Sequence, residues 1–137
     1  MAPPKAEGQA VSQGGRYPGR AAIDAYGNGG FRFAEMSHRG SILLLPSAIL
    51  AWPVMRPEEI TLAAFDAVLA EARAIDVLLV GTGTSAVPLA PELRRALERA
   101  ELWPEVMPTG PAARTFNILL SEDRAVAAAL IAVDDAY

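Results

Sequence analysis

An apolar run that ends at a loop of glycine and hydroxyl residues constrains the fold of this chain more than any other stretch. The run is Val77-Leu78-Leu79-Val80, and Gly81-Thr82-Gly83-Thr84-Ser85 follows it. Four consecutive apolar residues leave neither face of a strand for water, which is typical of a parallel strand covered on both sides. Because the run is short and glycine ends it, we expect a strand and not a buried helix. Ligands in open α/β sheets bind just past such strands, so the loop is a candidate site.

Composition excludes several classes of function. The chain has 137 residues, of which 52% are hydrophobic and 20% are charged, and this suits one domain with a proper core. The net charge of −4 argues against a nucleic-acid binder, because phosphate binding requires a basic face. Cysteine is absent and His38 is the single histidine, which excludes disulfides, thiol chemistry and a histidine-rich metal site.

No stretch has the length of a membrane span. The longest apolar stretch, residues 42–54, is broken by Pro46 and Pro53 and is shorter than the ~20 residues that a transmembrane helix needs. The N-terminal residues lack the apolar segment of a signal peptide. We therefore expect a cytoplasmic protein with no membrane span.

The first half of the chain is predicted to be mainly β. Residues 1–20 are rich in proline, glycine, glutamine and serine, so we expect a flexible N-terminal tail, followed by a single β/α domain over residues 21–137. Alternation around Gly27–Gly30 is typical of a hairpin. The predicted strands are Ile23–Tyr26, Phe31–Phe33, Ser41–Leu45 and Ala48–Trp52.

The second half alternates strands and helices. Apolar residues recur at helical spacing over residues 62–73, which predicts a helix there. Strands first and strand–helix units later indicate an α/β fold with its helices gathered against one face of the central sheet. The elements predicted after the central strand are a helix from Pro91, a short strand ending at Met107, a helix over Ala112–Leu120 and a final helix over Glu122–Val133.

Residues Thr109–Asn117 form a second candidate site. Thr109 as a helix cap, with the guanidinium of Arg114 one turn inside, would suit an anion. Alternatively, Arg114 pairs with Asp76 or Glu105, and Asn117 satisfies loop backbone. The residues leave both interpretations open.

Two familiar chemistries are disfavoured. Gly81–Ala86 fits the loose form G-x-G-x-x-A of a dinucleotide loop, but Pro88 and Pro91 delay the helix that this fingerprint requires. No Gly-Lys-Ser/Thr follows, which excludes a P-loop. His38 has no catalytic partner in its own motif, so a structural or solvent-facing histidine is favoured.

Taken in order, several motifs resemble the family of domains of unknown function that includes the mitochondrial respiratory complex I assembly factor three and the adipogenesis-associated domain protein. The resemblance covers about residues 21–133. Pro111 and Ala113 stand where relatives often carry alanine and cysteine, which puts any thiol chemistry in doubt. The motifs are His38–Leu43, Trp52, Asp76–Gly83, Met107–Leu119 and Glu122–Ala128.

The resemblance implies a three-layer β/β/α fold, with a mixed central sheet and a smaller antiparallel layer. It also implies that the loop and the Arg114 segment meet around one pocket, and that neither an established enzymatic activity nor a cofactor comes with the family. The candidate pocket residues are Gly81, Thr82, Gly83, Thr109, Arg114, Thr115 and Asn117.

Two functions compete at this point. The first is a non-enzymatic interaction module of the complex I assembly type, which would hold a respiratory subunit near the membrane through an exposed apolar region expected at Ile42–Met55. The second is a small anion or metabolite binder, a vestigial enzyme that would use the Gly81–Gly83 loop and Arg114.

Overall fold

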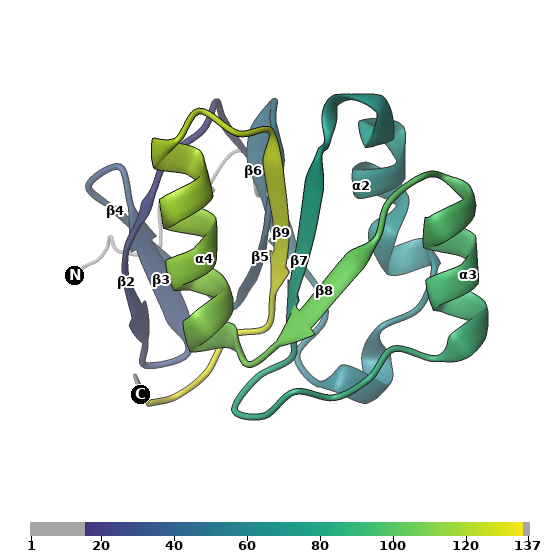
Figure 1. Ribbon diagram of the computed structural model, residues 1–137. Coiled ribbons are helices and arrows are strands. Elements are labelled where there is room, and N and C mark those ends of the chain that lie inside the picture. Colours follow the sequence, from purple (N-terminus) through teal and green to yellow (C-terminus); the bar gives the residue numbers. More distant parts are fainter. Residues whose placement is uncertain (1–15, 136–137) are drawn as a thin grey trace.

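A computed structural model describes residues 16–135, which form two β-sheets and three α-helices (Figure 1). The larger sheet has the strand order β1-β6-β5-β9-β7-β8, and the smaller one has the order β2-β3-β4. The strands are β1 (Arg16–Pro18), β2 (Ile23–Gly27), β3 (Gly30–Phe33), β4 (Met36–Arg39), β5 (Ser41–Leu44), β6 (Ala48–Trp52), β7 (Val77–Gly81), β8 (Pro104–Met107) and β9 (Val126–Leu130), and the helices are α2 (Asp66–Ala70), α3 (Pro91–Arg99) and α4 (Thr109–Ser121).

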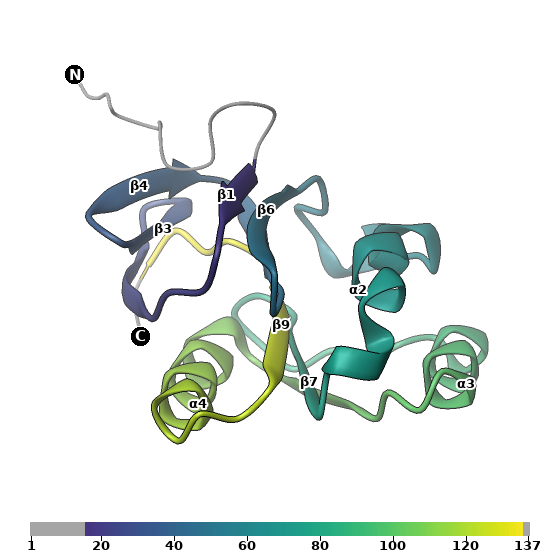
Figure 2. The same ribbon diagram turned by 90° about the horizontal axis from the view of Figure 1, so that it is seen from above.

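The larger sheet is the middle of three layers. Seen from above, it has α2 and α3 on one side and the smaller sheet with α4 on the other (Figure 2). The predicted fold class is confirmed, including the mixed central sheet and the small antiparallel layer.

The placement of all helices on one face is wrong, because α4 packs its Ala112, Ala113 and Phe116 with the smaller sheet. The chain steps outward from β7 through α3 to the edge strand β8, then back through α4 to β9, and all three strands are parallel. Right-handed crossovers in opposite directions put the two helices on opposite faces.

The C-terminal apolar run is a strand and not the predicted final helix. Val126–Leu130 forms β9, which is parallel to β7 and antiparallel to β5. Every residue of β9 is buried. A run that is apolar all round fits a buried helix and a doubly covered strand equally well, so its spacing cannot decide between them. The partners decide: β5 and β7 both have backbone groups that only a strand between them can pair.

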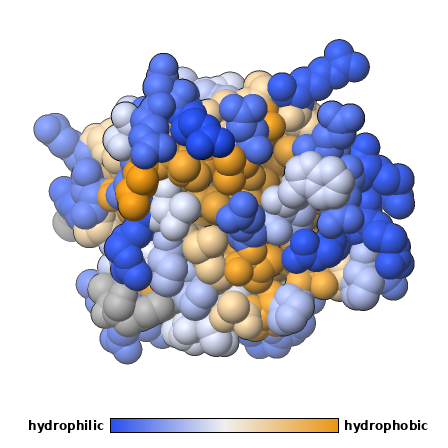
Figure 3. All heavy atoms as spheres, in the orientation of Figure 1, coloured by the Kyte–Doolittle hydropathy of each residue, from blue (hydrophilic) through white to orange (hydrophobic). Residues whose placement is uncertain are grey.

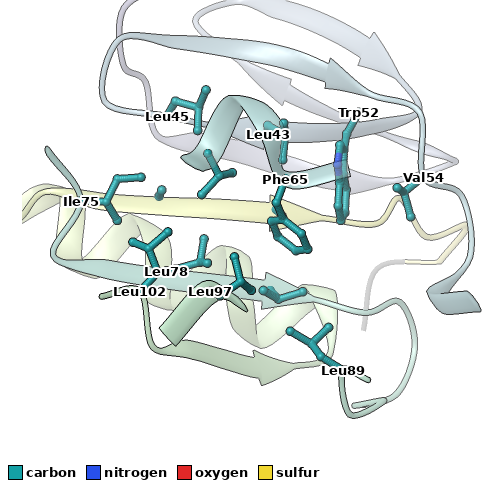
Figure 4. Packing of buried hydrophobic residues seen from close by; sticks show 14 of the residues in the cluster. Leu43, Leu45, Trp52, Val54, Phe65, Ile75, Leu78, Leu89, Leu97 and Leu102 are labelled. Atoms are coloured by element: carbon teal, nitrogen blue, oxygen red, sulfur yellow. The ribbon is translucent and has the colours of Figure 1, made fainter. Parts of the chain in front are cut away.

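The predicted helix over residues 62–73 is interrupted. Only Asp66–Ala70 is α-helical, and 3₁₀ turns at Ala63–Phe65 and Ala72–Ala74 flank it. Its apolar spacing is confirmed in part. Phe65 (Figure 4) and Val68 are fully buried in the core between the sheet, α2 and α3, whereas Leu62 at the start of the predicted helix is 44% exposed.

Smaller differences concern element ends. α4 begins at Thr109, three residues before the predicted helix start at Ala112. β4 was not among the predicted strands, and β1 lies inside the predicted tail, where it pairs with β6. Residues 1–15, the rest of that tail, lie outside the described residues.

Strand β8 is the edge of the larger sheet. The amide of Thr82 donates to the carbonyl of Met107 at 3.0 Å. This bond shows which residues of β8 direct their backbone groups towards β7. Glu105 and Met107 therefore turn their backbone groups towards β7, while Pro104 and Val106 turn theirs outward. Proline has no N–H, so the outer edge offers few donors to a further strand.

Candidate functional site

The glycine loop after β7 is tied to the start of α4 and to the end of β9. The Thr109 hydroxyl donates to the carbonyl of Ile131 at 2.7 Å and accepts the amide of Gly83 at 3.0 Å. The Thr109 amide donates to the Gly83 carbonyl at 2.8 Å. A Cβ atom on Gly81 would lie 2.9 Å from Cα of Thr109, so only glycine permits this approach. These bonds make the loop a structural junction of three elements.

Thr82 closes the loop itself. Its buried hydroxyl donates to the carbonyl of Ser85 at 2.6 Å and accepts the amide of Val87 at 2.9 Å. A hollow of about 450 Å³ lies outside this loop. It is lined by Met55, Pro57, Thr82–Ser85, Val87 and residues 131–134, and Arg114 is not among them.

The structure separates the second half of the predicted pocket from the first. Arg114 is exposed and lines a different hollow of about 290 Å³, between β2 and α4. Its side chain makes no ion pair or hydrogen bond with residues 16–135, so the alternative pairing with Asp76 or Glu105 is not formed there. Gly81, Thr82, Gly83 and Thr109 do meet, but Arg114 does not join them in one pocket.

Asn117 and Thr115 have structural contacts. The Asn117 side chain accepts the amide of Ile23 and donates to the carbonyl of Ile23, both at 2.8 Å, and so holds β2 against α4. The Thr115 hydroxyl lies 4.0 Å from Sδ of Met107 in β8. The sequence-based expectation that Asn117 satisfies backbone groups is correct, although the backbone belongs to a strand.

The one histidine is half-buried in β4. Nε2 of His38 lies 3.3 Å from the carbonyl of Ser41, a distance that suits an N–H donor at that nitrogen. Burial lowers the pKa of the His38 imidazole, and the hydrogen bond to Ser41 partly offsets this. The Ser41 hydroxyl is occupied as well, since it accepts the amide of Ala132 at 2.9 Å. This arrangement is that of a structural histidine.

The exposed apolar region expected at Ile42–Met55 is not a surface. Its larger apolar side chains, such as Ile42 and Ile49, are mostly buried in the two cores because β5 and β6 are internal strands of the sheet. Met55, at its end, is 53% exposed.

Another apolar surface lies between α4 and β8, and it was not predicted from the sequence. Trp103 is 62% exposed and Ile118 is 57% exposed. Figure 3 shows apolar residues gathered in the middle of this face. We define the α4–β8 strip as Val77, Trp103, Met107, Ile118 and Leu119, three of which pack partly against the core beneath α4.

Strand alternation accounts for the strip. Met107 packs on the α4 side of the sheet, and Glu105 and Trp103 follow at two-residue steps back along the chain. Continuing the register by one residue sets Trp103 opposite Val77. On α4, Ile118 lies one turn beyond Thr115, which touches Met107.

The described part of the chain has neither a cluster of metal ligands nor a membrane-spanning helix. Among residues 16–135, no group of three or more histidine, cysteine, aspartate or glutamate side chains is placed to hold a metal ion. Within the same part of the chain, no helix combines the length and the apolar character that crossing a bilayer requires.

Relatives of known structure share this fold. A crystal structure described as an outer membrane protein from Bartonella henselae has 53% sequence identity and a TM-score of 0.83, over 86% of this chain and 99% of that one. A solution structure of a Bordetella pertussis protein, described as an Mth938-like domain, has 30% identity and a TM-score of 0.72, over 85% of this chain and 88% of that one.

Relatives are also found among curated proteins. An uncharacterized protein of Rhodobacter capsulatus is 38% identical over 84% of this chain and 87% of its own length. The NADH dehydrogenase [ubiquinone] 1 alpha subcomplex assembly factor 3 of mouse is 32% identical over 84% of this chain, and the match spans 62% of the mouse protein. Residues 23–131 match the family described as protein of unknown function DUF498/DUF598. This chain therefore belongs to the DUF498/DUF598 family, and the family resemblance predicted from its motifs is confirmed.

Proposed function

We propose that this chain is a protein-interaction module of the assembly-factor type, which binds a subunit of a respiratory complex through the α4–β8 strip. The observation that carries the proposal is the exposure of two large apolar side chains, Trp103 just before β8 and Ile118 on α4. Large exposed aromatic and aliphatic side chains that lie together are typical of protein interfaces. The similarity to complex I assembly factor 3 supports the choice of partner class.

The charge around the strip indicates the chemistry of the partner. Glu105 lies between Trp103 and Met107 in the β8 segment, Asp76 precedes Val77, and Glu122 follows Ile118 by one turn of α4. All three carboxylates are exposed. A partner segment with apolar side chains flanked by lysine or arginine would complement such a surface.

Arg94 of α3 approaches β8 but already has acceptors for its guanidinium group. Nη1 of Arg94 lies 3.5 Å from the carbonyl of Pro104, on the outer edge of the strand, and 3.8 Å from a carboxylate oxygen of Glu98. The negative rim of the strip is thus not neutralised by Arg94, which already faces two acceptors.

Affinity capture tests the proposal. The immobilised chain, incubated with a detergent-solubilised membrane lysate, is expected to retain respiratory-complex subunits, identified by mass spectrometry. Ile118→Asp should reduce their recovery at least about tenfold, since burying an unpaired charge in an interface costs more than the 1.4 kcal/mol that corresponds to this factor.

The matched control is Leu62→Asp, which adds the same charge to another exposed apolar position, 44% exposed and outside the strip. Equal recovery with the wild type and Ile118→Asp would contradict the role of the strip. Recovery of ribosomes and chaperones alone would contradict the partner class.

A further inference from the structure

A second surface, independent of the α4–β8 strip, lies on the smaller sheet. A hollow of about 370 Å³ is lined there by residues of all three strands and of the turn between β2 and β3. We call it the basic hollow. Its lining residues are Ala25, Tyr26, Gly27, Asn28, Gly30, Phe31, Arg32, Ser37, His38 and Arg39.

Backbone forms part of the wall of the basic hollow. Gly27 and Gly30 are opposite each other across β2 and β3, and Gly30 is opposite Arg39 across β3 and β4. A Cβ atom on Gly30 would collide with the carbonyl oxygen of His38, so no side chain can be placed there. The row that crosses the sheet at Gly30 therefore carries one long side chain, that of Arg39.

Two arginines lie on this face of the sheet, Arg39 in this row and Arg32 in the next. Arg32 is opposite Ser37, and Arg39 is two residues further along the same strand. Diagonal neighbours of this kind have Cα atoms about 7–8 Å apart, a separation that lets two long side chains reach one small group between them. Both arginines are exposed.

The charges are also largely available. Nη1 of Arg32 donates to the hydroxyl of Ser37 at 3.0 Å, and the side chain of Arg39 makes no ion pair or hydrogen bond with residues 16–135. The residues that line the basic hollow include no aspartate or glutamate, although the whole chain has 16 acidic and 12 basic residues. An oxygen of the Asp134 carboxylate would lie 3.9 Å from a Cβ atom on Gly29, but Asp134 is not among the lining residues.

We propose that the basic hollow binds a small oxyanion, either a free phosphate or the carboxylate of a metabolite, between Arg32 and Arg39. Guanidinium groups present paired N–H donors that match the oxygens of both anions. Burial lowers the pKa of the His38 imidazole, which favours its neutral form, so the arginines supply the positive charge. The site differs from the anion site predicted at the Gly81–Gly83 loop and Arg114, and it does not depend on the proposed interaction function.

Titration with two separate probes, inorganic phosphate and citrate, tests the proposal. Each is added to the ¹⁵N-labelled chain at constant ionic strength, up to about 10 mM, which would nearly saturate a site with a Kd of about 1 mM. The amides of Gly27, Asn28 and Gly30 are expected to shift along a saturable curve. A response to one probe and not to the other assigns the source of the oxyanion.

Variants separate the site from general charge effects. Arg39→Gln and Arg32→Gln should each weaken binding about tenfold, the factor that corresponds to 1.4 kcal/mol. Arg39→Lys should retain part of the affinity, because lysine keeps the positive charge but lacks the paired N–H donors of the guanidinium group. Arg95→Gln on α3 removes the same charge on the far side of the molecule and should change nothing (Figure 1).

Three results would overturn the proposal. They are the absence of saturable shifts at these amides with both probes, shifts confined to the Gly83 loop, and equal weakening by Arg95→Gln. The dispersion of each variant's spectrum shows whether it is folded, so a loss of binding is not confused with a loss of structure.

Discussion

At the scale of single residues, the hydroxyl of Thr109 joins two elements that an apolar side chain of the same shape would leave apart. It donates to Ile131 and accepts from Gly83, and it is fully buried. Thr109→Val is isosteric and removes both bonds, leaving the Ile131 carbonyl against a methyl group. We expect a loss of about 2 kcal/mol in the free energy of unfolding, measured by urea denaturation.

Thr115→Val is the control for this substitution. Among residues 16–135, its hydroxyl has one partner, the sulfur of Met107 at 4.0 Å, so the same chemical change should cost less than about 0.5 kcal/mol. Equal losses in the two variants would mean that the junction at Thr109 is not what stabilises the loop.

His38 makes a second prediction at this scale. Its pKa is lowered in the folded chain, so the unfolded chain binds more protons as the pH falls through the ordinary value of about 6.5. Stability should therefore fall as the pH is lowered from about 7 to about 5.5, and His38→Gln should flatten this part of the profile. His38 is the single histidine of the chain, so a histidine titration in the stability profile can be assigned to it. An unchanged slope in the variant would contradict it.

At the scale of elements, Asn117 acts as a short substitute for a neighbouring strand. Its amide pairs with both backbone groups of Ile23 at the outer edge of β2, much as a strand would. Asn117→Ala should lower the protection of β2–β4 amides from hydrogen exchange by about 1–2 kcal/mol and leave β7 and β9 unchanged. A uniform loss over all strands would show instead that the substitution acts on global unfolding.

Apolar elements that end at a local stop signal were predictable from the sequence, and apolar elements without such a signal were not. β7 combines four apolar residues with a glycine stop, and its prediction is confirmed by Val77–Gly81. β9 is equally apolar but contains three alanines, which are compatible with a helix, so its identity depends on β5 and β7. The interruption of the predicted helix around α2 is likewise a tertiary effect, since its apolar spacing is regular.

The candidate site shows the same division. Local chemistry at Gly81, Thr82 and Thr109 was visible in the sequence, because glycines and hydroxyls follow a buried strand. The position of Arg114 depends on which side of α4 faces the smaller sheet, and no local pattern specifies that. The α4–β8 strip and the basic hollow both arise from pairing between segments, so neither has a signature in one stretch of sequence.

At the scale of the whole molecule, β9 joins two halves of the larger sheet, β1-β6-β5 and β7-β8. A chain that ends at Ser121 lacks this strand, and the two halves would share no hydrogen-bonded pair. We expect this truncated chain to show no cooperative unfolding transition by circular dichroism, whereas a chain that ends at Asp135 should keep it. A cooperative transition in the shorter chain would contradict the central role of β9.

The late position of that strand has a consequence for biosynthesis. While the ribosome still encloses β9 in its exit tunnel, β5 and β7 of the nascent chain lack the partner that lies between them. Unpaired edges of this kind favour association with other chains. Native closure of the sheet must then wait until β9 leaves the tunnel, which makes the interval before that point the period when a holdase would matter most to this protein.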